Sequence, residues 1–180
     1  MKRMLKNVFA FLISLGLCLS ACVSSAPGSV SPYRLAAFSQ NSVSVKIAFQ
    51  QDASHAIFLI ATFTPISGDH LYSKDLPRGG IYGEGRPTLL ELTPQSGMRA
   101  MGGLTASVNQ EVASMGVDAL LVYPAGLVTL KLPVSLPAGQ GWYDDQVSVT
   151  YEACSQTTCK TPVIGRMVRV HVPRMGQLEP

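Results

Sequence analysis

The sequence lacks an apolar run long enough to span a membrane. A transmembrane helix needs about 20 apolar residues, whereas the run that follows Lys2, Arg3 and Lys6 covers only residues 8 to 19. A short apolar run behind a positively charged start is typical of a secretion signal. We therefore predict that residues 1 to 21 are a signal peptide and that the rest of the chain is exported.

Without the signal peptide, the chain also lacks a surplus of positive charge. Lys and Arg fall from 14 to 11 when Lys2, Arg3 and Lys6 are removed, and Asp and Glu stay at 11. Binding to nucleic acid needs a basic stripe that neutralises phosphates. We therefore expect no nucleic acid among the partners. The 159 residues that remain of 180 are enough for one domain and a short leader.

Most motifs that mark enzymes are missing as well. No Ser/His/Asp order and no pair of carboxylates stands out, and the glycine pairs at 79–80 and 102–103 have no predicted helix behind them to cradle a phosphate. His55, His70 and His171 are too scattered to complete a metal site with two cysteines. We therefore expect no hydrolase chemistry, no nucleotide binding, no metal and no separate cofactor.

Helical periodicity is absent beyond the signal, because residues 107 to 115 are long enough for one short helix at best. Alternating apolar and polar residues instead predict short strands, with Gly or Pro in most gaps. The predicted strands are residues 43–49, 55–63, 88–92, 119–123, 127–134, 147–154 and 167–172. About seven short strands predict an all-β fold, and an immunoglobulin-like two-sheet β-sandwich fits them better than a closed barrel.

The signal peptide ends in a motif for lipid attachment. Leu19-Ser20-Ala21-Cys22 resembles the bacterial lipobox, in which the cysteine is lipidated and becomes the new N-terminus. The resemblance implies a bacterial lipoprotein anchored through Cys22 at the periplasmic face, and Val23 after it implies the outer membrane. Ordinary secretory cleavage beside an unrelated cysteine is the alternative.

The domain limits follow from composition. Small, polar, Pro- and Gly-containing residues follow Cys22, so we predict that residues 22 to 38 are a flexible tether from the lipidated cysteine. Residues 39 to 173 contain the predicted strands and form the single domain. Residues 174 to 180 are expected to be a frayed tail.

Two of the four cysteines remain as thiols after these steps. Cys18 is lost with the signal and Cys22 is used by the lipid, which leaves Cys154 and Cys159 in an exported protein, where disulfides persist. The strand at 147–154 aims Cys154 away from its valine face, and the Ser/Thr-rich residues 155–158 suit a hairpin turn. Such a turn brings the two Cα atoms within the roughly 4.4–6.8 Å that a disulfide tolerates.

An internal disulfide here has two interpretations, a structural staple or a redox pair. In the chain-entropy model a loop of about six residues stabilises the fold by only about 2 kcal/mol, against about 4.7 kcal/mol for a 100-residue loop. Exposed disulfides in short turns also exchange more easily with other thiols. These arguments favour redox chemistry, and the staple stays open as the alternative.

The hairpin resembles a known family of redox domains. Tyr151, Cys154, Cys159 and Pro162 follow the Y-x-x-C, C-x-x-P pattern of the N-terminal periplasmic domain of the thiol:disulfide interchange protein DsbD. Two further segments are similar to strands of that family. They are residues 66–77, which contain Tyr72, and residues 127–137.

The resemblance implies an immunoglobulin-like domain that passes reducing equivalents by thiol exchange. Electrons would come from a thioredoxin-like module or a membrane electron donor on a separate chain, and would go to exported disulfide-containing proteins. Cys159 would form the mixed disulfide with partners, Cys154 would resolve it, and Tyr72 would lie beside both cysteines.

Four further residues are candidate neighbours of the cysteines. Lys160 favours a thiolate on Cys159 and Glu152 opposes ionisation of Cys154, unless both charges are simply solvated. His70 is a candidate for acid–base help, and Tyr151, on the valine side of its strand, is expected to pack in the core. The rival function is a lipoprotein binding or assembly module in which the disulfide is only a staple.

Overall fold

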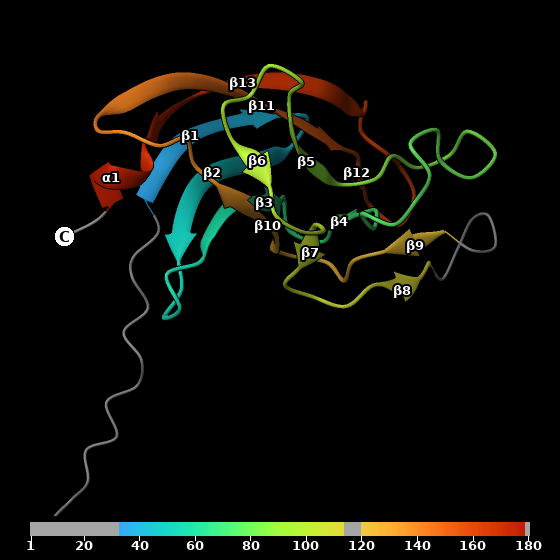
Figure 1. Ribbon diagram of the computed structural model, residues 1–180. Helices are drawn as coiled ribbons and strands as arrows, with labels where there is room; N and C mark the ends of the chain where they lie inside the picture. The colour runs from blue at the N-terminus through green and yellow to red at the C-terminus, as the bar shows by residue number, and fades with distance from the viewer. Residues whose placement is uncertain (1–32, 114–119, 179–180) are drawn as a thin grey trace, which may run out of the picture.

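The protein is an all-β sandwich of two antiparallel sheets, as the alternation of residues predicts (Figure 1). The computed structural model describes residues 33–113 and 120–178. The larger sheet consists of β1 (Tyr33–Gln40), β2 (Val43–Gln51), β3 (Ile57–Pro65), β10 (Val128–Ser135), β6 (Arg99–Ala100) and β7 (Thr105–Ala106). Its order is β1-β2-β3-β10-β6, and β7 also pairs with β10.

The smaller sheet has the order β13-β11-β5 and covers one face of the larger sheet (Figure 1). It consists of β13 (Val163–Pro173), β11 (Trp142–Tyr151) and β5 (Leu89–Leu92). Two short pairs lie beyond these sheets, β12 (Ala153–Cys154) with β4 (His70–Leu71) and β8 (Glu111–Val112) with β9 (Leu121–Val122). A one-turn helix, α1 (Met175–Leu178), lies in the predicted tail.

The core lies between the two sheets and is built from the period-two pattern of the strands. In β10, Val128, Leu130, Leu132 and Val134 are all buried, while the residues between them are half-buried. Burying a side chain of this size stabilises the fold by about 1.5–3 kcal/mol. β3 is mostly apolar on both faces, and most of its residues are buried. Alternation in the sequence was therefore a sound guide to the inner face of each long strand.

Two parts of the sequence prediction are wrong. The predicted flexible tether includes residues 33 to 38, but these residues belong to β1, which pairs with β2. A register shift between Arg34 and Ala36 breaks the alternation of this edge strand, and most of its side chains remain exposed or half-buried. Residues 107 to 113, the described part of the suggested short helix, contain strand β8 instead. Residues 1 to 32, with the predicted signal peptide and Cys22, lie outside the described residues.

The end of β11 delivers the cysteine hairpin to one end of the sandwich. β11 pairs with β13 along most of its length, but the register shifts between Val149 and Tyr151. The chain then leaves the smaller sheet, and β12 pairs with β4. As Figure 1 shows, β4, β8, β9 and β12 gather at this end, away from the main sheets. Among the described residues, no helix is long and apolar enough to cross a membrane.

Candidate functional site

Cys154 and Cys159 form a disulfide, as predicted. The two residues face each other as an antiparallel pair. Backbone hydrogen bonds lie on both sides of the pair, from Lys160 N to Ala153 O at 2.8 Å and from Ser155 N to Thr158 O at 2.9 Å. Cysteines at such a position have closely spaced Cα atoms. The Cα–Cα distance is 4.0 Å, slightly below the expected range.

Ser155 closes the turn between the two cysteines. Its Oγ accepts hydrogen bonds from the backbone N–H groups of Thr157 and Thr158, at 3.3 and 3.1 Å. A serine hydroxyl often replaces a backbone acceptor in this way. The Ser- and Thr-rich composition between the cysteines therefore has a local structural reason.

The two sulfur-bearing residues differ in exposure. Cys154 is only 2% exposed and packs with Tyr72, Leu76, Leu120 and Val122 in a small second hydrophobic cluster. Cys159 is exposed to solvent at the outer strand of the hairpin. An attacking thiolate therefore reaches the Cys159 side of the disulfide first, and Cys154 becomes the leaving group.

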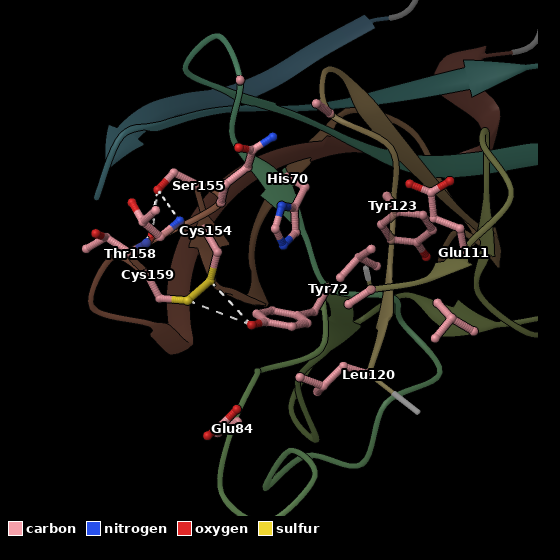
Figure 2. A pocket seen from close by; sticks show the side chains of 17 residues that line it. His70, Tyr72, Glu84, Glu111, Leu120, Tyr123, Cys154, Ser155, Thr158 and Cys159 are labelled. Atoms are coloured by element: carbon pink, nitrogen blue, oxygen red, sulfur yellow. Dashed lines mark hydrogen bonds between the residues drawn. A yellow bond between two sulfur atoms is a disulfide. The ribbon is translucent and has the colours of Figure 1, made fainter. Parts of the chain in front are cut away.

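Tyr72 lies directly beside the disulfide (Figure 2). Its hydroxyl oxygen is 3.4 Å from Cys154 Sγ and 3.7 Å from Cys159 Sγ. Neither sulfur of a disulfide has a proton, so the tyrosine hydroxyl is the donor in this contact. Burial raises the pKa of Tyr72, and the negative charges of Glu152 and Glu84 raise it further. The hydroxyl therefore keeps its proton and is available to stabilise negative charge on either sulfur.

Tyr72 is held from several directions. Its carbonyl accepts hydrogen bonds from Thr88 Oγ1 at 2.7 Å and from Thr88 N at 3.2 Å, and the residue pairs with Val122 at the end of β9. The loop before β5 covers one face of its ring. Gly85, with a φ of +76°, lies so close that an added Cβ would be 3.0 Å from two ring atoms of Tyr72. The loop itself is clamped by Arg86 Nη1, which donates to the carbonyls of Gly79, Gly83 and Gly85.

Gly85→Ala should therefore destabilise the site and displace the Tyr72 ring. An alanine at this φ is strained by about 1–3 kcal/mol, and its methyl group crowds the ring as well. We expect a loss of about 1–3 kcal/mol in the free energy of unfolding, measured by urea denaturation. Gly83→Ala is the matched control, because Gly83 has a similar φ of +86° but nothing within 4 Å of an added Cβ. If the two variants leave Tyr72 equally reactive towards tyrosine-modifying reagents, Gly85 does not position the ring.

Glu152 is a second polar group close to the sulfurs. A carboxylate oxygen of Glu152 and the two Sγ atoms all lie within 4.8 Å of one another. Glu152 is half-buried, and burial raises the pKa of its carboxyl group, while the charge of Arg86 opposes this shift. In the disulfide the two sulfurs are bonded to each other, so neither is a free thiolate that could bind a metal ion together with Glu152.

His70 lies on the same face as Cys154, because the two residues are paired partners in β4 and β12. Its ring is edge-on to that of Tyr72, with centroids 5.9 Å apart. Desolvation lowers the pKa of His70, although Asp69 and Glu111 oppose this shift, so the ring is neutral at neutral pH.

A cavity of about 790 Å³ opens beside the disulfide. Its lining includes His70, Tyr72, Val122 and the whole hairpin segment 154–159, with Glu84 and Glu111 at two sides (Figure 2). The cavity is open to solvent and adjoins both cysteines. It therefore gives a partner molecule access to the disulfide.

Two of the predicted neighbours lie away from the sulfurs. Tyr151 is in the sandwich core, 1% exposed, where its ring meets Phe63 edge-on and its hydroxyl donates to Gln40 O. Lys160 is paired with Ala153, so the register places it on the opposite face of the hairpin from Cys154 and Cys159. The structure thus brings together His70, Tyr72 and Glu152 with the cysteines, but not Tyr151 or Lys160.

The loop from Leu76 to Thr88 was missed by sequence reasoning. It supplies Glu84, Gly85 and Arg86, which all act on Tyr72 or Glu152. The signal for it in the sequence is its four glycines, Gly79, Gly80, Gly83 and Gly85, which are typical of a tight loop.

The chain was compared with protein families and with curated protein sequences. No protein-family model matches the chain, and no curated protein sequence is similar to it.

Proposed function

We propose that this protein is an envelope thiol–disulfide exchange protein that passes reducing equivalents through Cys154 and Cys159. The donor would be a thioredoxin-like protein or a membrane electron donor on a separate chain, and the recipients would be exported proteins with disulfides. The single observation behind the proposal is a disulfide with one exposed and one buried cysteine at the edge of an open cavity. The resemblance of the hairpin to the DsbD N-terminal domain supports the same function.

The exchange chemistry follows from the exposure of the two cysteines. A donor thiolate attacks Cys159 Sγ, the bond to Cys154 Sγ breaks, and Cys154 leaves as a thiolate. The second thiol of the donor then attacks the mixed disulfide and releases Cys159, which leaves the protein reduced by two electrons and the donor oxidised. Running these steps in the opposite direction reduces a recipient disulfide.

The Tyr72 hydroxyl favours Cys154 as the sulfur that leaves when the disulfide opens. Negative charge develops on the buried Cys154 sulfur, and an uncompensated charge there would be costly. Tyr72 provides a hydrogen-bond donor 3.4 Å away. A disulfide that served only as a staple would have no need of a donor at this position.

A redox titration of the purified protein tests the proposal. We expect a reduction potential in the range of exchange proteins, roughly −120 to −270 mV, measured by equilibration with glutathione or dithiothreitol buffers and alkylation of free thiols. A potential below about −300 mV is typical of structural disulfides and would contradict the proposed function in favour of a binding or assembly module.

A further inference from the structure

We propose that Glu152 is the acid–base group that delivers a proton to the Cys154 sulfur and removes it again during exchange at Cys159. This inference rests on the exchange chemistry proposed above and assigns a role to a residue that this chemistry does not yet use. Its starting point is the cluster in which the Glu152 carboxylate and both sulfurs lie within 4.8 Å of one another.

The need for a proton arises from the burial of Cys154. When the disulfide is opened at Cys159, the leaving sulfur belongs to a residue that is only 2% exposed. Solvent therefore has poor access to this sulfur, and a buried thiolate is costly to leave charged. The Tyr72 hydroxyl can donate a hydrogen bond, but its raised pKa makes it a poor source of a full proton. A second group has to supply the proton.

Glu152 has the right position for this transfer. Glu152 lies between β11 and β12, two residues before Cys154, and its carboxylate reaches the side of the chain on which both sulfurs lie. The separation of up to 4.8 Å is within reach of a proton transfer through one bridging water. His70 is also near Cys154, but among the described residues the cluster within 4.8 Å contains Glu152 and the cysteines without His70.

Protons and electrons are conserved both when the disulfide is reduced and when it forms again. During reduction of the protein, a donor thiolate bonds to Cys159 Sγ, Cys154 Sγ leaves with the electron pair, and protonated Glu152 transfers its proton to that sulfur. During oxidation, the Glu152 carboxylate takes the proton from the Cys154 thiol, and the thiolate formed attacks the mixed disulfide at Cys159. The partner thiol leaves with the electron pair of the broken bond.

The surroundings of Glu152 are suited to a group that changes its protonation state. Its carboxyl group is half-buried, and desolvation raises its pKa above the usual value, towards the pH at which thiols react. Arg86 limits the shift by favouring the charged form. Other titratable side chains around the disulfide and its cavity are Tyr72 directly after β4, His70 on β4, Glu84 on the loop before β5 and Glu111 on β8.

The test is the pH dependence of reduction by dithiothreitol, which requires no cellular partner. Oxidised protein is mixed with excess dithiothreitol between pH 4 and pH 9, and free thiols are quenched by alkylation and counted by mass spectrometry. Each rate constant is divided by the dithiothreitol thiolate concentration, because that concentration itself changes with pH. We expect the normalised rate constant of the wild type to rise at least about tenfold as pH falls through the pKa of Glu152. This rise is a single step in the plot of the normalised rate constant against pH.

The Glu152→Gln variant should lose this step and have the same normalised constant at every pH, because its amide neither donates a proton nor becomes negative. His70→Gln should keep the step, which separates the two titrating groups. Tyr72→Phe should lower the constant at every pH and keep the step, since it removes a hydrogen bond and not the proton source. Asp144→Asn is the control for loss of a carboxylate away from the site, because Asp144 lies near the start of β11, is exposed and is paired with His171.

A step that persists in Glu152→Gln, or that disappears in His70→Gln, overturns the proposal. If Glu152→Gln does not fold, carbon-13 NMR of the wild type decides the question. The titration midpoint of the Glu152 carboxyl must then coincide with the midpoint of the rate step, and a difference larger than about one pH unit overturns the assignment. These outcomes are independent of partner trapping in cells, so failure of this proposal can be told apart from failure of the proposed function.

Discussion

A Cys154→Ala variant should accumulate mixed disulfides with envelope proteins in cells. The variant keeps Cys159, the exposed cysteine, but has lost the thiol that would resolve a mixed disulfide at this position. Partner complexes should therefore survive non-reducing electrophoresis and disappear when a reductant is added. Mass spectrometry of these bands would identify the electron donor and the recipient.

The matched variant is Cys159→Ala. It keeps only Cys154, which is 2% exposed and covered by Tyr72, so a partner disulfide has little access to its sulfur. We expect at least about tenfold fewer trapped complexes than for Cys154→Ala, because access limits exchange. The double variant, in which both residues are alanine, shows whether Cys18 or Cys22 contributes any bands.

Two other patterns would be informative. More complexes with Cys159→Ala than with Cys154→Ala would reverse the roles of the two cysteines and contradict the exposure argument. If neither variant traps an envelope protein, the disulfide is a staple, and a binding or assembly role becomes the better explanation of the cavity.

The sequence predicted the sheets well because burial has a period of two in strands with one inner face. β10 shows this clearly, since its valines and leucines alternate with half-buried residues along the whole strand. β1 escaped prediction because it is an edge strand with a register shift, so its apolar residues do not alternate regularly. Its start follows directly on the linker-like residues 23 to 32, so the predicted tether was drawn too long.

Within the site, local features could be predicted and long-range features could not. Cys154 and Cys159 are five positions apart, so a turn was enough to pair them. Lys160 directly follows Cys159, and neighbouring strand residues point to opposite faces, which favours the alternative that its charge is simply solvated. The alternation of the sequence groups Glu152 with Cys154, and in the structure its carboxylate lies within 4.8 Å of both sulfurs.

The environment of Tyr72 depends on contacts that no local pattern encodes. Arg86 clamps its own loop through three backbone carbonyls, and Gly85 then rests against the Tyr72 ring. These contacts join segments without periodicity, so only the folded chain shows that the loop before β5 belongs to the site.

Cys22→Ala should release the protein from the membrane or leave it unprocessed. We propose that the sulfur of Cys22 receives a diacyl group, and two acyl chains are enough for stable anchoring, at about 0.8 kcal/mol for each buried CH₂ group. Alanine has no sulfur, so the lipid cannot be attached. Cys18→Ala is the matched control, since Cys18 lies inside the predicted signal and should not affect fractionation. The measurement is the share of the protein that sediments with membranes, together with the mass of its N-terminal peptide.

The proposed anchor also bears on how the disulfide meets its partners. A domain tethered to the membrane surface is confined with any membrane-bound donor, which raises the effective concentration of one for the other without any new contact. We therefore expect Cys22→Ala to reduce trapping of membrane proteins by Cys154→Ala more than trapping of soluble ones. If the Cys22→Ala protein is cleaved at the same site and still sediments with membranes, lipidation does not hold it there, and a bound membrane partner becomes the explanation to test.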